Sequence, residues 1–186
     1  TCRGSRFADG AKRNPNGEVF MKNRETDEWL TQNIKSTRNF VRKWGHLVMH
    51  DDFLKPIVPP KYDVAFIIEN CNNHLLEHLE PWCSVIYVDS YIEDYIEREN
   101  KNTLYNLHKR VRKSDRFTDG SHDIEVKFDG TKFNQNSFEH IENLSQILAN
   151  DEELEVGSFE LDIFEITIND IKTYEKSLIV CKNKKA

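Results

Sequence analysis

The stretch DVAFIIENCNNHLLEHLEPWCSVIYVD, residues 63–89, decides the fold. It opens and closes with short apolar runs, Asp63–Glu69 and Ser84–Asp89, whose length is typical of buried strands. Between them, Asn72-Asn73 supplies the cap of a short helix that ends by Pro81. A strand, a helix and a second strand in this order predict a mostly parallel sheet.

The residues downstream continue the alternation of strands and helices. Asp123–Asp129 alternates apolar and charged residues, as a half-exposed strand does, and Asn134–Asn150 repeats apolar residues at helical spacing. Phe159–Ile168 and Ser177–Cys181 complete the predicted strands, whereas residues 90–117 are predicted to be helical or irregular. The predicted fold class is therefore α/β, a mostly parallel sheet with covering helices.

One further helix is predicted over residues 26–44, before this region. Thr26 can cap its start, Asp27 and Glu28 place negative charge in its first turn, and Gly45 can end it. Phe40 and Trp44 recur on its apolar face, and we expect both to be core anchors rather than platforms for a sugar ring.

A domain boundary is predicted at residues 56–61, where Pro56, Pro59 and Pro60 remove amide donors and favour extended backbone. Residues 1–61 carry 12 Lys and Arg against 7 Asp and Glu, and residues 62–186 carry 14 against 25. These net charges of +5 and −11 add to the −6 of the whole chain. We therefore expect a first domain at 1–55, a Pro-rich linker at 56–61 and an α/β domain at 62–186.

The composition excludes several classes of protein. The 186 residues include 11 Phe, 6 Tyr and 3 Trp, enough large apolar side chains to argue against disorder. No apolar run approaches the length of a membrane span, and no signal-peptide pattern opens the sequence. The four cysteines form no C-x-x-C pair and do not indicate a disulfide framework, which favours a cytoplasmic protein.

Two groups of residues carry a resemblance to a known family. Arg3-Gly4 is followed some forty residues later by Asn39–Gly45, NFVRKWG. This pattern resembles the end of the catalytic domain of family-2-type glycosyltransferases of the GT-A fold. The runs from Pro60 to Asp63, Leu79 to Cys83 and Ile86 to Asp89 are similar to domains appended to such enzymes in phage and marine microbial sequences.

The resemblance implies an activity, a cofactor and a binding site. It implies that residues 1–55 are the helical remnant of a GT-A catalytic domain that transfers sugar from a nucleotide-sugar donor to an acceptor hydroxyl of a glycan, with divalent Mn or Mg. The Asp-x-Asp motif and metal-binding His of that family would precede Thr1, so we expect this chain to be inactive alone and to bind no metal. The donor diphosphate would contact basic side chains of the first loop, namely Arg3, Arg6, Lys12 and Arg13.

Competing interpretations rest on shorter motifs. His74-Leu75-Leu76-Glu77-His78 fits H-x-x-E-H, in which two helical His bind zinc and Glu activates water, although a partly exposed helix is the interpretation we favour. His46, His50, Asp51 and Asp52 form a second cluster, for which we expect polar surface rather than a metal or acceptor site.

A nucleotide or nucleic-acid site is less well supported. The first strand ends in Glu69–Asn73 without glycine, which argues against a dinucleotide site, whereas Asp89 ends the second strand where open sheets bind ligands. The basic cluster Lys109–Lys113 lies in a strongly acidic region, so no nucleic-acid partner is expected. A stand-alone α/β binding or interaction module without catalysis remains the alternative to the transferase.

Overall fold

A computed structural model of the chain describes residues 26–113, 121–150 and 155–170. The chain divides into two compact units, Thr1–Thr37 and Arg38–Ala186. In the first unit the described residues form the start of helix α2 (Asp27–Trp44). Thr26 caps it as predicted, because the Thr26 hydroxyl accepts a hydrogen bond from the Trp29 amide at 3.3 Å.

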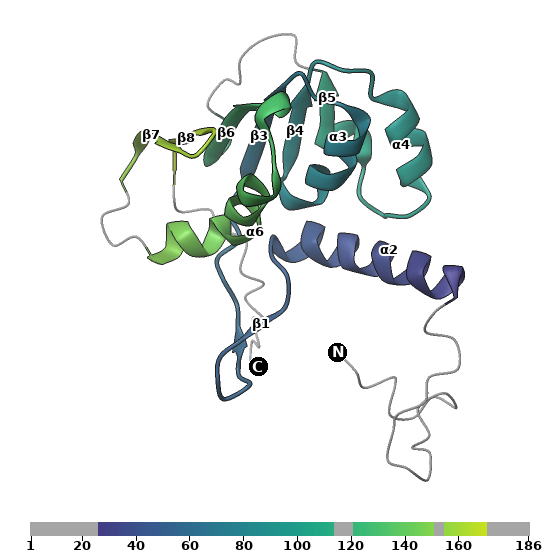
Figure 1. Ribbon diagram of the computed structural model, residues 1–186, viewed down its shortest axis with the longest axis horizontal. Helices are drawn as coiled ribbons and strands as arrows, with labels where there is room; N and C mark the ends of the chain where they lie inside the picture. Colours follow the sequence, from purple (N-terminus) through teal and green to yellow (C-terminus); the bar gives the residue numbers. More distant parts are fainter. Residues whose placement is uncertain (1–25, 114–120, 151–154, 171–186) are drawn as a thin grey trace, which may run out of the picture. The chain divides into compact units, whose positions relative to one another are not determined.

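The second unit is built on a six-stranded sheet with strand order β5-β4-β3-β6-β8-β7 (Figure 1). β3 pairs in parallel with β4 and β6, and β4 pairs in parallel with β5. β8 runs antiparallel to both β6 and β7, so the sheet is parallel except at one edge. The strands are β3 (Val64–Glu69), β4 (Val85–Val88), β5 (Val111–Lys113), β6 (Ile124–Asp129), β7 (Gly157–Leu161) and β8 (Phe164–Ile168).

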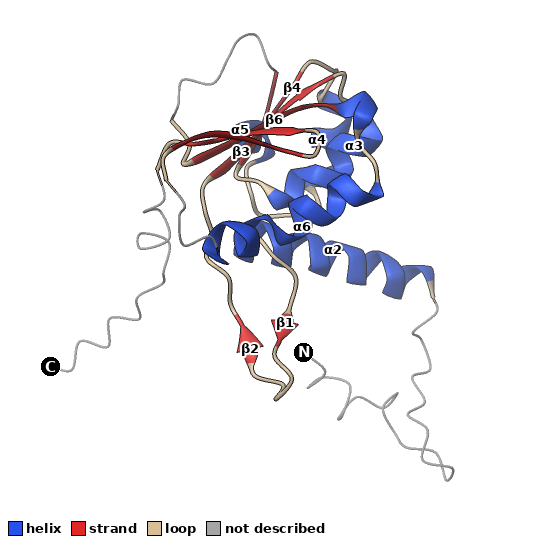
Figure 2. Cartoon of the chain, turned by 60° about the vertical axis from the view of Figure 1, so that its left-hand side comes forward, coloured by secondary structure: helices blue, strands red, loops and turns tan. Residues whose placement is uncertain are grey.

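Helices α3, α4 and α6 lie on the same face of this sheet (Figure 2). Alternate strand residues such as Phe66, Ile86 and Val126 are fully buried under them, together with Leu76 and Leu79 of α3. This alternation is the period-two pattern of a sheet that packs a helical layer against one face. The helices are α3 (Asn73–Leu79), α4 (Glu93–Asn100), α5 (Leu107–Arg110) and α6 (Gln135–Asn150), and short 3-10 turns follow α3 (Glu80–Trp82) and β6 (Gly130–Lys132).

Helix α2 ends where the sequence predicts. Gly45 adopts a positive φ of 77°, and its amide donates to the Val41 carbonyl at 2.7 Å. The Lys61 ammonium donates to the Arg42 and Lys43 carbonyls at 2.7 and 2.9 Å, which satisfies two more carbonyl groups of the last turn. Burial, helped by the positive charge of Arg110, lowers the pKa of Lys61 to about 8.

A two-stranded hairpin follows α2 and projects from the unit in Figures 1 and 2. It pairs β1 (Met49–His50) with β2 (Pro56–Ile57) in antiparallel register. Part of the predicted Pro-rich linker is thus the second strand of a hairpin. Pro56 tolerates this position because the pairing is only two residues long and lies at an edge.

Three predicted elements differ from the structure or lie outside it. The predicted strand Phe159–Ile168 is a hairpin of β7 and β8, with Asp162 at a positive φ of 56° in the turn. The predicted helical or irregular region contains the short edge strand β5. The predicted strand Ser177–Cys181 lies outside the described residues.

The second unit is held together by a buried carboxylate, Glu80, which is 0% exposed. Arg42 of α2 donates two hydrogen bonds to one Glu80 oxygen, from Nε at 3.0 Å and from Nη2 at 2.6 Å. Arg110 of α5 donates from Nε at 2.6 Å to the other oxygen, and the Tyr95 hydroxyl of α4 donates at 2.8 Å. Glu80 therefore joins three helices that are distant in sequence.

A second carboxylate extends this Glu80 cluster. Glu99 of α4 accepts hydrogen bonds from Arg42 and, at 2.9 Å, from Arg38. Burial alone would raise the pKa of the Glu80 carboxyl, but the hydrogen bonds and charges of Arg42 and Arg110 outweigh it and hold that pKa below its usual value. The same balance, with Arg42 and Arg38 as partners, lowers the pKa of Glu99. Both groups are therefore ionised in the folded protein.

The Glu80 cluster places part of α2 inside the α/β unit. The compact unit begins at Arg38, within the helix, rather than at residue 62. Arg42 and Val41 are buried in it. The proposed origin of residues 1–55 in a transferase domain stays a prediction, but the folding unit does not stop at the proline-rich segment.

Replacing Glu80 tests the importance of this cluster. Glu80→Ala leaves Arg42 and Arg110 buried without their shared carboxylate, which should lower the free energy of unfolding by about 3–5 kcal/mol. Urea denaturation monitored by circular dichroism measures the loss. Glu77→Ala is the matched control, because Glu77 pairs with Arg98 on the surface and should cost less than about 1 kcal/mol. Equal, small effects of both substitutions would show that the cluster contributes little.

Candidate functional site

The predicted donor-binding residues cannot be placed. Arg3, Arg6, Lys12 and Arg13 all lie outside the described residues, so their role stays a prediction. The site is therefore sought in the second unit. In open α/β sheets ligands bind beyond the carboxyl ends of the parallel strands, and these ends carry several polar side chains here.

The loops at the carboxyl ends of β3, β4 and β6 are tied together by two aspartates. Both Asp89 oxygens accept backbone hydrogen bonds, from the Asn70 amide at 2.7 Å and from the Cys71 amide at 3.0 Å. Asp129 accepts from the Asn70 side chain at 3.1 Å and from the Thr131 amide at 2.9 Å. Asp89 was a candidate ligand-binding residue, but its carboxylate is occupied in holding the loop after β3.

A groove lies beside these loops, between the first turns of α3 and α6. It has a volume of about 260 Å³. Its walls combine imidazole, amide and aromatic side chains and contain no Lys, Arg, Asp or Glu. The lining residues of this α3–α6 groove are Asn72, His74, Leu75, His78, Gly130, Phe133, Asn134, Gln135 and Phe138.

The floor of the α3–α6 groove depends on Gly130. A Cβ atom at this position would lie 2.8 Å from a Leu75 methyl group and 3.0 Å from the Asn70 carbonyl oxygen. Real side chains do not approach backbone so closely, so only glycine lets the loop after β6 pack against α3. This close approach fixes the distance between the two helices that form the groove.

His74 and His78 form one wall of the groove. Their rings are one helical turn apart and stack with centroids 6.4 Å apart and an interplanar angle of 19°. The His78 ring also packs on Phe138 of α6, with centroids 4.2 Å apart. Burial lowers the pKa of His78, and the positive charges of His74 and Arg38 lower it further. His78 therefore contributes a neutral ring that can donate or accept a hydrogen bond.

The H-x-x-E-H motif does not assemble as a zinc peptidase would require. Glu77 is turned to Arg98, and the two side chains form an ion pair at 2.6 Å. Within residues 26–113, 121–150 and 155–170, no group of three His, Cys, Asp or Glu side chains could hold a metal ion. His74 and His78 remain as a pair that faces the groove rather than as part of a three-ligand centre.

The other predicted cluster is dispersed. His46 is buried, contrary to the expectation of polar surface, whereas His50 is exposed. The Asp51 carboxylate accepts the Phe53 and Lys55 amides at 2.9 and 2.8 Å and so shapes the tip of the β1–β2 hairpin. Phe40 and Trp44 are not core anchors either, since Phe40 is partly buried and Trp44 is 37% exposed.

The structure also reveals a polar chain at the amino ends of β3 and β6. His122 Nδ1 lies 3.1 Å from an Asp63 oxygen, and His122 Nε2 lies 3.4 Å from the Tyr87 hydroxyl. The side chain of Asn169 donates to the His122 carbonyl at 3.0 Å. These contacts join three strands and the end of β8, and no cavity lies over them among the described pockets. We interpret the chain as a structural clamp.

Sequence reasoning found half of the α3–α6 groove. The H-x-x-E-H motif singled out His74 and His78, but nothing linked them to Asn134, Gln135 and Phe138, which lie about sixty residues further along the chain. The one available signal was the Asn134 cap, since its side chain accepts the Asn136 and Ser137 amides at 2.9 and 3.2 Å at the start of α6.

Comparisons with protein-family models, with curated proteins and with solved structures find no match for this chain. The resemblance to glycosyltransferases therefore stays an expectation from the sequence. The buried thiols of Cys71 and Cys83 are free, as expected from their apolar neighbours. No helix among the described residues has both the length and the apolar character needed to cross a membrane.

Metal binding by the histidine pair can be tested directly. We expect zinc at well below one equivalent after dialysis against a weak chelator, because two imidazoles without a third protein ligand hold zinc poorly. Metal analysis of the dialysed protein and of His78→Ala measures this. One equivalent of retained zinc that disappears in His78→Ala would contradict the assignment and favour a metal centre.

Proposed function

We propose that the unit Arg38–Ala186 is a binding module for a neutral, hydroxyl-rich ligand about the size of one sugar residue. The observation that carries this proposal is the lining of the α3–α6 groove, where aromatic rings and amide and imidazole groups meet without a charged side chain. Aromatic faces cover the apolar faces of a sugar ring, and amides and imidazoles both donate to and accept from hydroxyl groups.

The absence of charge in the groove argues against other small ligands. A nucleotide diphosphate needs cations or a glycine-rich loop, and neither lines the groove. An acidic or basic metabolite would leave its charge without a partner, which is costly in a partly buried site. The volume of about 260 Å³ lies just below the range of drug-sized pockets, which fits a single small ring.

A glycan ligand connects this proposal with the resemblance of the sequence. We infer that the module holds the glycan acceptor of a glycosyltransferase whose catalytic domain uses a nucleotide-sugar donor and a divalent metal. The support is the motif Asn39–Gly45 together with the chemistry of the groove. Arg3, Arg6, Lys12 and Arg13 remain the proposed ligands of the donor diphosphate on the strength of the resemblance alone.

The alternative is a binding module that works without a transferase. The same groove supports it, so ligand binding alone does not separate the two. Sugar transfer by the protein together with its catalytic region separates them, because only the transferase proposal requires that a groove substitution raise KM for the acceptor while leaving KM for the donor unchanged.

Sugar binding is tested by titrating the protein with a panel of methyl glycosides and recording ¹⁵N–¹H spectra. We expect at least one glycoside to shift the amides of His74, Leu75 and Gln135 selectively, with a Kd on the order of 1 mM, or about −4.1 kcal/mol. Phe138→Ala should weaken that binding by roughly tenfold, because an aromatic contact contributes about 0.5–1.5 kcal/mol beyond its buried area.

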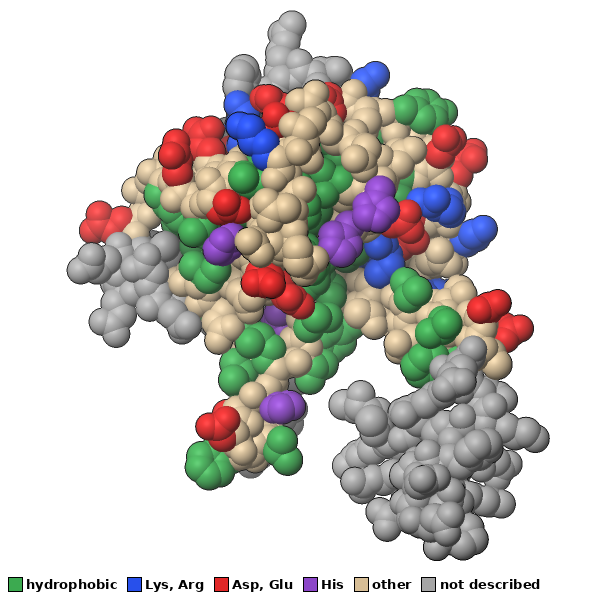
Figure 3. All heavy atoms as spheres, viewed as in Figure 1, with side chains coloured by type: hydrophobic (Ala, Val, Ile, Leu, Met, Phe, Trp, Pro, Cys, Tyr) green, Lys and Arg blue, Asp and Glu red, His purple; other side chains and the backbone are tan. Residues whose placement is uncertain are grey.

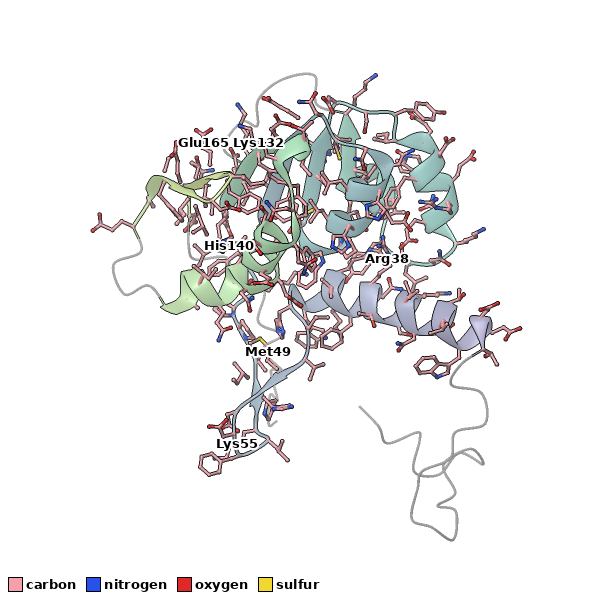
Figure 4. The ribbon with its side chains drawn as sticks, viewed as in Figure 1. Arg38, Met49, Lys55, Lys132, His140 and Glu165 are labelled. Carbon is pink, nitrogen blue, oxygen red and sulfur yellow. The ribbon has the colours of Figure 1, made fainter. Side chains whose placement is uncertain are left out.

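Glu165→Ala provides the matched control, since Glu165 is exposed on β8 and lies apart from the groove residues (Figure 4). It should bind like the parent protein. If no glycoside shifts the groove amides, or if Phe138→Ala binds as well as the parent, the groove is not a sugar site.

A further inference from the structure

A second cavity lies between the end of α2 and the β1–β2 hairpin, away from the α3–α6 groove. It has a volume of about 220 Å³, and its walls are almost entirely apolar. All of its residues belong to the second unit. The lining residues of this hairpin groove are Phe40, Trp44, His46, Val48, Met49, Pro56, Ile57 and Val58.

The hairpin adds further apolar surface beside the groove. Phe53 at its tip is 83% exposed, and Leu54 beside it is also exposed. The tip is ordered by the Asp51 carboxylate and by a bond from the Leu54 amide to the Asp51 carbonyl at 2.9 Å, with Leu54 at a positive φ of 61°. Hydrophobic side chains are visible at the tip and along the base of the hairpin in Figure 3. Exposed apolar surface around a concave groove is typical of a protein-binding site.

One polar group in the hairpin groove distinguishes it from a bare apolar surface. His46 is 5% exposed, and its Nδ1 lies 2.6 Å from the Leu47 carbonyl oxygen. A carbonyl can only accept, so Nδ1 carries the hydrogen and the uncharged ring presents a lone pair at Nε2. Nε2 is buried and has no hydrogen-bond partner within the described part of the chain.

This buried acceptor selects the chemistry of the occupant. A group that enters the apolar groove must donate one hydrogen bond to Nε2 and must bring no further polar atom, because nothing else in the groove could pair with it. Lysine and arginine would bury a charge, and a serine or tyrosine hydroxyl would bury unused lone pairs. The indole of tryptophan carries a single N–H donor, no acceptor and a large apolar body.

We propose that the hairpin groove binds the tryptophan side chain of a partner polypeptide, with the indole N–H donating to His46 Nε2. The surrounding exposed residues favour a polypeptide over a free small molecule, since Val48, Val58 and the hairpin tip extend beyond the space that one ring system fills. A tryptophan anchor in an apolar pocket with an apolar rim is the arrangement of a binding hot spot. This inference does not depend on the proposed sugar site.

The test compares two probes that differ only in the indole donor. N-acetyl-tryptophanamide and N-acetyl-1-methyl-tryptophanamide are titrated into the full chain, and ¹⁵N–¹H spectra report the amides of Phe40, Val48 and Ile57. We expect N-acetyl-tryptophanamide to shift these amides and the ring Nε2 signal of His46. The methylated probe should bind at least tenfold more weakly, because it leaves Nε2 without a donor.

Two variants complete the experiment. His46→Phe keeps an aromatic ring but removes the acceptor, so both probes should bind it with equal affinity. If this variant does not fold, the Nε2 signal of the parent protein alone decides, because only a direct hydrogen bond to the indole moves it strongly. Tyr91→Ala, which removes an exposed aromatic side chain outside the groove, should bind both probes like the parent.

Three outcomes would overturn the proposal. The first is that neither probe shifts the groove amides, and the second is that both probes bind the parent equally well. The third concerns the source of the indole: a tripeptide with leucine on both sides of tryptophan should bind more tightly than 3-methylindole. Tighter binding of 3-methylindole would assign the groove to a small molecule, and groove shifts that grow with protein concentration alone would assign it to a second copy of the chain.

Discussion

The buried carboxylate of Glu80 is the interaction on which the α/β unit depends. It lies in the 3-10 turn after α3, and it receives hydrogen bonds from α2, α4 and α5 through Arg42, Tyr95 and Arg110. A carboxylate removed from water is costly unless each oxygen is paired, so the three helices must all be in place before Glu80 can be buried. Arg110 also donates to the Glu80 and Cys83 carbonyls, which fixes the chain at the start of β4.

The same cluster positions the α3–α6 groove. Arg38 donates to the Glu77 carbonyl in the last turn of α3 and to the Tyr95 hydroxyl at 2.7 Å, and it is labelled between α2 and α3 in Figure 4. Its charge also contributes to the lowered pKa of His78. The neutral imidazole that faces the groove is therefore partly a consequence of the packing of α2. The hairpin groove depends on the same helix, since Phe40 and Trp44 follow Arg38 within two turns.

Local patterns in the sequence predicted most of the fold. The apolar run of β3, the Asn72 cap of α3 and the apolar spacing of α6 each depend on neighbouring residues, and these elements lie within one or two residues of their predicted bounds. The predicted strand Phe159–Ile168 was wrong because apolar alternation continues through the turn at Asp162, where only a backbone angle marks the reversal. β5 was missed because its exposed charges belong to a cluster that resembles solvated surface.

The sites were harder to predict because their residues meet only in the folded protein. Arg42 and Glu80 are 38 residues apart, and both read as ordinary surface charges in the sequence. His46 appeared as part of a polar cluster, yet it is buried because Phe40 and the hairpin close over it, with the Phe40 ring edge-on at 6.4 Å. No local pattern carries that information, since it arises from the register of a two-residue hairpin against the end of a helix.

Amide hydrogen exchange in the intact chain tests the central claim most directly. If the Glu80 cluster makes the end of α2 part of the α/β unit, the amides of Val41 and Arg42 should exchange only through global unfolding. Their free energies of opening should then equal those of Phe66 in β3 and Val126 in β6. Opening of Val41 and Arg42 at a free energy several kcal/mol lower, while the sheet stays protected, would show that the helix is an appendage and that Glu80 does not organise the unit.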